Sequence, residues 1–201
     1  MELVLCTGNE GKLAELRALL PAHIHLRSLK EFQLPTDLPE TGDTLEANAY
    51  QKARWVHARC GLWCVADDTG LEVDALDGAP GVYSARYAGP ERDAQANMHK
   101  LLAELDGRID RRARFRTVLA CVTPSSEFQV EGVVQGRILR EPRGLLGFGY
   151  DPIFEPDGHD RSFAEMPLAL KNSLSHRGRA VRAFMMKLSA SVPEAWPAPD
   201  R

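Results

Sequence analysis

The chain has 201 residues, of which 44% are hydrophobic, 26% charged and 7% aromatic. This length suits one large domain or two small lobes around a sizeable core, and the composition excludes a largely disordered chain, a collagen-like repeat and a coiled coil. The 25 basic and 28 acidic residues give a net charge of −3, so no basic domain indicates duplex binding.

In the first third of the chain, short apolar runs alternate with amphipathic patterns. Residues 3–6 predict a buried strand, and a leucine-faced helix follows that Pro21 ends. Residues 28–44 contain two prolines and a glycine and predict an irregular connection. Apolar residues recur at helical spacing over roughly 44–59, and a strand is expected at 62–66.

The rest of the chain mixes both kinds of element, which indicates an α/β or α+β protein. The expected segments are loops at 77–92, a helix at 93–105, a hairpin of strands at 115–122 and 128–134, loops at 140–168 and a helix at 175–190. The segment 193–201 has three prolines and is expected to be a frayed tail after a single domain at 1–192.

The four cysteines, at positions 6, 60, 64 and 121, are too few for a disulfide scaffold. Only Cys60 and Cys64 are close in sequence, whereas zinc sites usually need two such pairs or nearby histidines, so buried reduced thiols are expected. No apolar run is long enough for a signal peptide or a membrane span, which favours the cytoplasm.

A loop that could bind an anion lies between the first strand and the first helix. Backbone N–H groups at such a helix N-terminus attract phosphate, and the lysine adds charge. The spacing is not that of a P-loop, so an ordinary strand-to-helix turn stays an alternative. The loop residues are Thr7, Gly8, Asn9, Glu10, Gly11 and Lys12.

Asp67 and Asp68 follow an apolar run and precede Thr69 and Gly70. Carboxylates at the end of a buried strand suit Mg²⁺, which takes one or two of them together with phosphate oxygens and waters. Neighbours in an extended segment point to opposite faces, so one aspartate would face the cleft and the other would orient it. A type I turn from Asp67 to Gly70 explains the same four residues.

Two later segments add an aromatic surface and a second basic site. Phe148 between two glycines could stack on a nucleobase or could be an ordinary core aromatic. Lys171 with the run 175–177 favours a polyphosphate at a helix start, although a capped, solvated helix end would look the same. The arginine-rich segment 108–116 has only Phe115 as a stacking aromatic and is expected to be a solvated edge.

Taken together in this order, the segments resemble the inosine/xanthosine triphosphate pyrophosphatase family from about residue 4 to 188. The matching motifs are Thr7-Gly8-Asn9 with Lys12, Asn48-Ala49 with Lys52-Ala53, the run 66–71, the run 80–87, the run 147–152, and Ala164-Glu165-Met166 with Lys171 and Ser175-His176-Arg177. The resemblance implies an elongated, two-lobed α/β fold with a long central mixed sheet, an active-site cleft between the lobes, and a homodimer.

The resemblance also implies Mg²⁺-dependent hydrolysis of deaminated purine nucleoside triphosphates (ITP, dITP, XTP) to the monophosphate and pyrophosphate, which cleanses the nucleotide pool. It places Mg²⁺ on Glu40 and Asp68, with Asp68 also the catalytic base. It implies that the remaining residues bind substrate: the phosphate loop 7–12, then Thr69, Phe148, Gly149, Tyr150, Asp151, Lys171, His176 and Arg177.

Two other functions remain as alternatives. One is a pyrophosphatase for modified pyrimidine or methylated nucleotides, against which Phe148 and the run 175–177 argue. The other is a nucleotide- or nucleic-acid-binding module without catalysis, using the glycine loop and segment 108–116. The acidic residues Glu40, Asp67 and Asp68 argue against that module, because a pure binder of anions gains nothing from clustered carboxylates.

Overall fold

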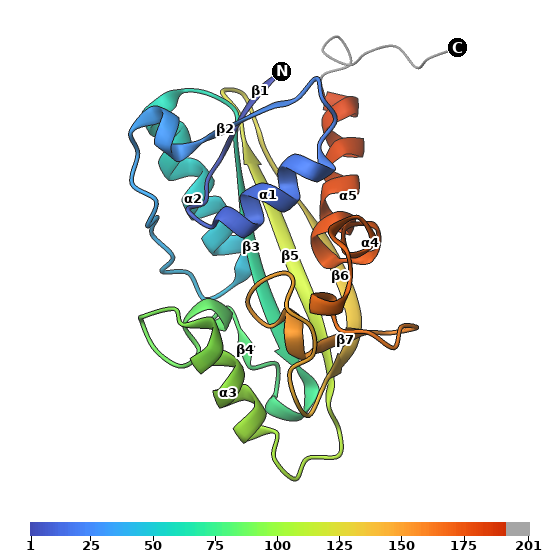
Figure 1. Ribbon diagram of the computed structural model, residues 1–201. Coiled ribbons are helices and arrows are strands. Elements are labelled where there is room, and N and C mark those ends of the chain that lie inside the picture. The colour runs from blue at the N-terminus through green and yellow to red at the C-terminus, as the bar shows by residue number, and fades with distance from the viewer. Residues whose placement is uncertain (192–201) are drawn as a thin grey trace, which may run out of the picture.

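A seven-stranded mixed sheet runs the length of the molecule in the computed structural model, which describes residues 1–191 (Figure 1). The strands are β1 (Glu2–Leu5), β2 (His25–Ser28), β3 (Cys64–Val73), β4 (Pro80–Gly81), β5 (Arg112–Val122), β6 (Glu127–Ile138) and β7 (Phe154–Pro156). The helices are α1 (Glu10–Leu19), α2 (Leu45–Cys60), α3 (Ala94–Glu104), α4 (Leu168–Leu174) and α5 (His176–Ser191).

The strand order is β2-β1-β3-β5-β6-β7, and β4 pairs with the far end of β3. β1 lies parallel to both of its neighbours, whereas β3, β5, β6 and β7 pair antiparallel. The register places Asp68 opposite Val118 in the middle of the β3–β5 ladder. The long strands therefore connect the end of the molecule that carries α1, α2 and α5 with the end that carries α3 (Figure 1).

Alternating side chains of the strands build two apolar layers, one on each face of the sheet. On β1, Leu3 and Leu5 pack with α1 and α5, whereas Val4, and Cys6 just after the strand, pack with α2. This period of two matches an extended strand that is buried on both faces. A third cluster, around Phe154, packs α3 against the far end of the sheet.

Local sequence explains where the main helices begin and end. Asn9 caps α1 by accepting a hydrogen bond from the backbone N–H of Lys12, and Asp93 caps α3 in the same way. α2 stops at Gly61, whose φ of 67° gives the left-handed conformation that glycine adopts at little cost.

The structure confirms the α/β architecture and most of the expected elements but corrects several boundaries. The strand expected at 62–66 is β3, which continues to Val73, so the interpretation of residues 67–70 as a turn was wrong. Strand β2 was not predicted, and its last residue, Ser28, is the first residue of the connection expected at 28–44. A 3₁₀ turn at Leu29–Phe32 follows it. The loops at 140–168 include β7, and α4 follows them.

The remaining sequence-based predictions on organisation are not tested in the same way. The tail at 193–201 lies outside the described residues, and the single domain at 1–192 stays a prediction. Among residues 1–191, no helix combines the length and the apolar character needed to cross a bilayer.

Candidate active site

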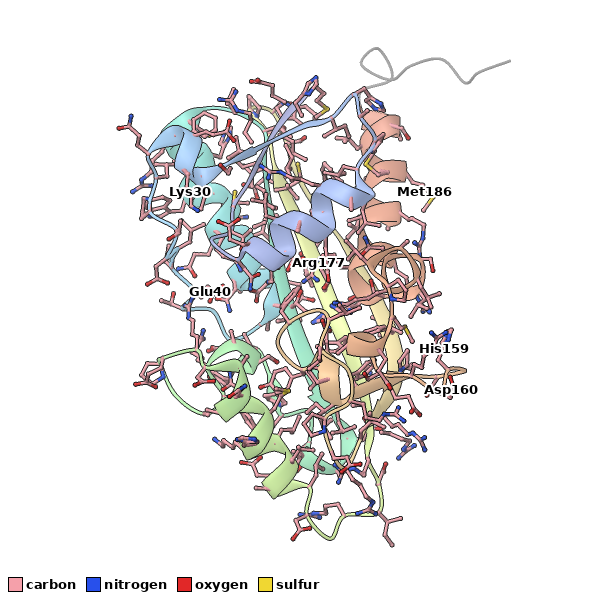
Figure 2. The ribbon with its side chains drawn as sticks, in the orientation of Figure 1. Lys30, Glu40, His159, Asp160, Arg177 and Met186 are labelled. Carbon is pink, nitrogen blue, oxygen red and sulfur yellow. The ribbon has the colours of Figure 1, made fainter. Side chains whose placement is uncertain are left out.

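A cavity of about 500 Å³ opens between the start of α1, the segment before α2, and the loop that precedes β7. Figure 2 shows Arg177 in the interior behind α1 and Glu40 on the segment that leads into α2. The predicted site residues that line the cavity are Thr7, Gly8, Asn9, Lys12, Glu40, Thr69, Phe148, Gly149, Tyr150, Asp151, Lys171, His176 and Arg177. Segments far apart in sequence therefore meet at one hollow.

The predicted phosphate loop forms one wall of this cavity. Gly8 is required there, because a Cβ on it would lie 2.7 Å from the Cβ and backbone oxygen of Thr36. Lys12 extends into the cavity wall, where its Nζ lies 2.7 Å from Oδ1 of Asp67. Glu10 is exposed, and its carboxylate lies 2.7 Å from Nζ of Lys30. It lines a separate, smaller cavity of about 210 Å³ rather than the main one.

Asp67 lies at the centre of the charge network beneath the cavity. It is fully buried on β3. Its Oδ2 lies 2.6 Å from Nε of Arg177, and its Oδ1 lies 2.7 Å from Nζ of Lys12. Burial opposes ionisation, but the charges of Arg177 and Lys12 outweigh it and hold the pKa of Asp67 well below its usual range. Asp67 therefore fixes two cations beside the cavity.

Asp68 points to the opposite side of β3, toward α2. Its Oδ1 lies 2.6 Å from Nζ of Lys52, and the same Nζ lies 2.7 Å from Oε1 of Glu40. Burial raises the pKa of Asp68 even though Lys52 opposes the shift. Asp68 itself is not among the residues that line the cavity, whereas its partner Lys52 and Glu40 both are.

The donor set at this point suits a divalent cation. Glu40 and Asp68 already share one positive charge, so their carboxylates are close enough to hold a metal ion jointly. No group of three or more metal-binding side chains occurs within residues 1–191. Mg²⁺ does not need one, because it takes one or two carboxylates and completes its shell with phosphate oxygens and waters.

Phe148 and the buried pair of Lys171 and Asp151 form the other end of the cavity. The backbone N–H of Phe148 donates to Oδ2 of Asp151 at 2.8 Å, and the same oxygen receives Nζ of Lys171 at 2.6 Å. The ring of Phe148 lies directly against Gly11, where a Cβ would come within 2.6 Å of it. Gly11 thus leaves room for the aromatic ring rather than contacting the cavity.

His176 begins α5 and is 3% exposed. Its ring stacks on Phe115 with centroids 4.6 Å apart, and its Nδ1 has no hydrogen-bond partner within the described part of the chain. Burial and the charges of Arg177 and Lys171 lower the pKa of His176 well below its usual range, so the imidazole is neutral at pH 7. A buried polar atom without a partner at a cavity wall indicates a place where a ligand completes the hydrogen bonding.

Sequence reasoning did not assign a role to Lys52 or Glu15. Lys52 occupies the apolar stripe of α2 between Ala49 and Val56, and a lysine at such a position is a detectable signal of a buried partner. Glu15 likewise is a buried acid on α1, where it pairs with Lys171 at 2.6 Å and with Arg177. Their partners come from distant segments, which the local pattern does not identify.

Comparison with known proteins identifies the family to which a chain with this site belongs. The Ham1 family model matches residues 3–187. The chain belongs to the Ham1 family. This Ham1 chain is 51% identical over 189 residues to the dITP/XTP pyrophosphatase of Christiangramia forsetii, covering 94% of this chain and all of that relative. It is 50% identical over 181 residues to that of Porphyromonas gingivalis, covering 90% and 93% of the two chains.

Solved structures agree with this assignment. The Ham1 protein of Staphylococcus aureus superposes with a TM-score of 0.86 at 36% identity, over 95% of this chain and all of that one. A nucleoside-triphosphatase / dITP/XTP pyrophosphatase of Mycobacterium abscessus gives 0.74 at 45% identity, over 92% and 99%. The family resemblance seen in the sequence is confirmed, and the Ham1 chain is an enzyme of the pyrophosphatase type.

Proposed function

We propose that this enzyme hydrolyses deaminated purine nucleoside triphosphates, namely ITP, dITP and XTP, between the α and β phosphates. The products are the nucleoside monophosphate and pyrophosphate, so the reaction removes damaged precursors from the nucleotide pool. The observation that carries the proposal is the unpartnered Nδ1 of the buried His176 in a cavity that also contains a Lys-carboxylate cluster. The names of the relatives support the same substrate class.

His176 supplies the reason for choosing a 6-oxo purine. A neutral imidazole that carries its proton on Nδ1 donates one hydrogen bond, and the 6-oxo group of hypoxanthine or xanthine accepts one. The 6-amino group of adenine is a donor and would leave both groups without a partner. Such a mismatch discriminates strongly between substrates in a buried site. Phe148, next to this end of the cavity, would stack on the base.

At the phosphate end, the substrate carries about four negative charges that must be offset before a nucleophile approaches phosphorus. Mg²⁺ bound by Glu40 and Asp68 would neutralise part of this charge. Lys12 and the backbone N–H groups at the start of α1 bind phosphate oxygens, and Lys171 and Arg177, each paired with buried carboxylates, complete the pocket. Thr69 extends from the same strand as Asp68 and places a hydroxyl at the cavity.

Asp68 is the proposed general base. The raised pKa of its buried carboxylate makes it a better proton acceptor than an exposed aspartate. It takes a proton from the attacking water as the oxygen–phosphorus bond forms, and the bridging P–O bond breaks to release pyrophosphate.

We also propose, from the resemblance alone, that the enzyme is a homodimer with its cleft between two lobes. Light scattering at micromolar concentration would show a monomer if this is wrong. The cytoplasmic location stays a prediction.

The test is a panel of pyrophosphate-release assays on the purified enzyme. ITP, dITP and XTP should be hydrolysed in the presence of Mg²⁺, whereas ATP, which lacks the 6-oxo group, and dTTP and methylated nucleotides should be poor substrates. Preferential hydrolysis of modified pyrimidine or methylated triphosphates would favour the related pyrophosphatase activity instead. Tight nucleotide binding without turnover of any triphosphate would identify a binding module and refute the proposal.

A further inference from the structure

Three of the four cysteines gather in one layer between α2 and the sheet. Cys6 follows β1, Cys60 ends α2 and Cys64 begins β3, and all three belong to the same apolar cluster. Cys121 belongs to the cluster on the other face of the sheet. All four are free thiols, and only Cys60 is partly exposed. The cluster thus has one member that solvent reaches and two that it does not.

The geometry within the cluster favours one pair. Sγ of Cys60 lies 3.6 Å from Sγ of Cys64, across the short connection that follows the end of α2 at Gly61. A hydrogen bond from Cys6 lowers the pKa of Cys64. A hydrogen bond from Cys60 lowers it further, and burial acts in the opposite direction. A thiolate is the form that attacks another sulfur atom. Within residues 1–191, no group of three or more metal-binding side chains occurs, and these cysteines therefore do not form such a group.

We propose that Cys60 and Cys64 are a modification site that forms a reversible disulfide when the protein meets a hydroperoxide. Cys60 is the thiol that reacts with the oxidant, because it is the accessible one. Cys64 is the thiol that completes the bond, because it is buried, adjacent and hydrogen-bonded by Cys6. The proposal does not depend on the nucleotide substrate.

The chemistry balances in two steps. Burial raises the pKa of Cys60, so the first step proceeds through the ionised fraction of this thiol. That thiolate attacks one oxygen of hydrogen peroxide, the O–O bond breaks, and a sulfenic acid and one water are formed. The thiolate of Cys64 then attacks the sulfur of Cys60, the S–O bond breaks, and a second water leaves. Two thiols lose two electrons and two protons, and the peroxide is reduced. A dithiol reductant reverses the reaction by thiol–disulfide exchange.

The bond would tie the last residue of α2 to the first residue of β3. These two elements also carry Lys52 and Asp68, whose ion pair lies beside the cavity. The disulfide would therefore form at the end of the same helix–strand unit that holds the acidic part of the candidate site, outside the cavity wall itself.

The experiment uses the full chain, reduced, desalted and then treated with hydrogen peroxide before the remaining thiols are alkylated. Trypsin releases a peptide covering residues 60–86, which contains Cys60 and Cys64 and no other cysteine. We expect this peptide to lose two hydrogen atoms in mass and to carry no alkyl group, while Cys6 and Cys121 are alkylated. Treatment with dithiothreitol before alkylation should restore two alkyl groups on the peptide.

Matched variants separate this pair from the other thiols. Cys121→Ser should form the bond as the wild type does, whereas Cys60→Ser and Cys64→Ser should not, with folding checked by circular dichroism. The proposal is overturned if the wild-type peptide stays fully alkylated, if it carries only sulfinic acid, or if it is linked to the peptide that contains Cys6. The wild-type mapping decides the matter even where a variant fails to fold.

Discussion

Arg177 on α5 donates through Nε to Oδ2 of Asp67 on β3 at 2.6 Å, and both side chains are fully buried. The two residues are 110 positions apart in sequence. Their contact joins the outer helix to the central strand directly beneath the cavity. Arg177 also donates to Glu15 on α1 and to the hydroxyl of Thr69 on β3, so this guanidinium joins three elements of the site: α5, β3 and α1.

We therefore expect Asp67→Ala to act mainly on stability. It leaves the buried Arg177 and the partly buried Lys12 without their shared carboxylate, and breaking a buried pair in this way costs about 3–5 kcal/mol. Urea unfolding at pH 7 measures the loss, with the exposed Asp157→Ala as the matched control. A difference below about 1 kcal/mol from the control would contradict the role assigned to Asp67.

Asp67 also predicts the acid sensitivity of the fold. The pKa of Asp67 is lowered in the folded state. The stability that its carboxylate contributes is therefore fully present above the pKa of the unfolded chain, about 3.9, and is lost as the pH falls below that value. In that range the wild type should lose about 1.4 kcal/mol per pH unit more than Asp67→Asn. Unfolding free energies from pH 7 to pH 3 test this, and parallel curves for the two proteins would refute it.

Asp68→Asn should act mainly on turnover. The amide keeps the size but loses the basicity, so the turnover number should fall by at least about 10²-fold. Asp68 is 6% exposed and pairs with Lys52, so some loss of stability should accompany the change. Turnover and melting temperature are measured on the same samples. Near wild-type turnover would mean that the base lies elsewhere.

Lys12→Ala should weaken substrate binding more than it slows chemistry. Its Nζ contacts Asp67 in the absence of substrate, and a phosphate contact that is equal in ground and transition states changes KM and leaves kcat nearly constant. Steady-state kinetics on ITP separate the two constants, and Lys30→Ala, on the neighbouring surface, is the control. A fall in kcat with unchanged KM would assign Lys12 to the transition state instead.

His176→Phe should reduce base discrimination. The ring keeps its packing on Phe115 but loses Nδ1, so the ratio of kcat/KM for ITP to that for ATP should fall by at least about tenfold. The low pKa of His176 keeps it neutral, so the wild-type ratio should be constant from pH 6 to pH 8. An unchanged ratio in the variant would remove His176 from base recognition.

Removal of divalent cations should abolish hydrolysis. The substrate's charge otherwise repels the nucleophile, and without a metal ion the cation that pairs with both Glu40 and Asp68 is Lys52. Excess EDTA should stop pyrophosphate release and added Mg²⁺ should restore it. Undiminished turnover in EDTA would contradict the metal assignment.

Local patterns in the sequence were sufficient for most of the longer elements, and the family resemblance supplied the remaining predicted residues of the cavity wall. The leucines of α1, the cap at Asn9 and the stop at Gly61 act over a few residues, so their effect is visible in the chain itself. The strand that carries Asp67 and Asp68 was shortened in prediction, because Thr69 and Gly70 resemble a turn. Pairing with β5 along the whole of β3 overrides that local preference.

The order of residues along the chain is enough to identify the chemical groups of this protein and the family to which it belongs. The way their charges are shared is visible only in the folded chain, where Asp67 lies between Arg177 and Lys12, and Lys52 lies between Asp68 and Glu40. It also required Gly132 on β6, where a Cβ would lie 2.1 Å from the backbone oxygen of His176, so that α5 can approach the sheet. Such contacts depend on distances between remote segments, and those distances are set by packing of the whole core rather than by any local run of residues.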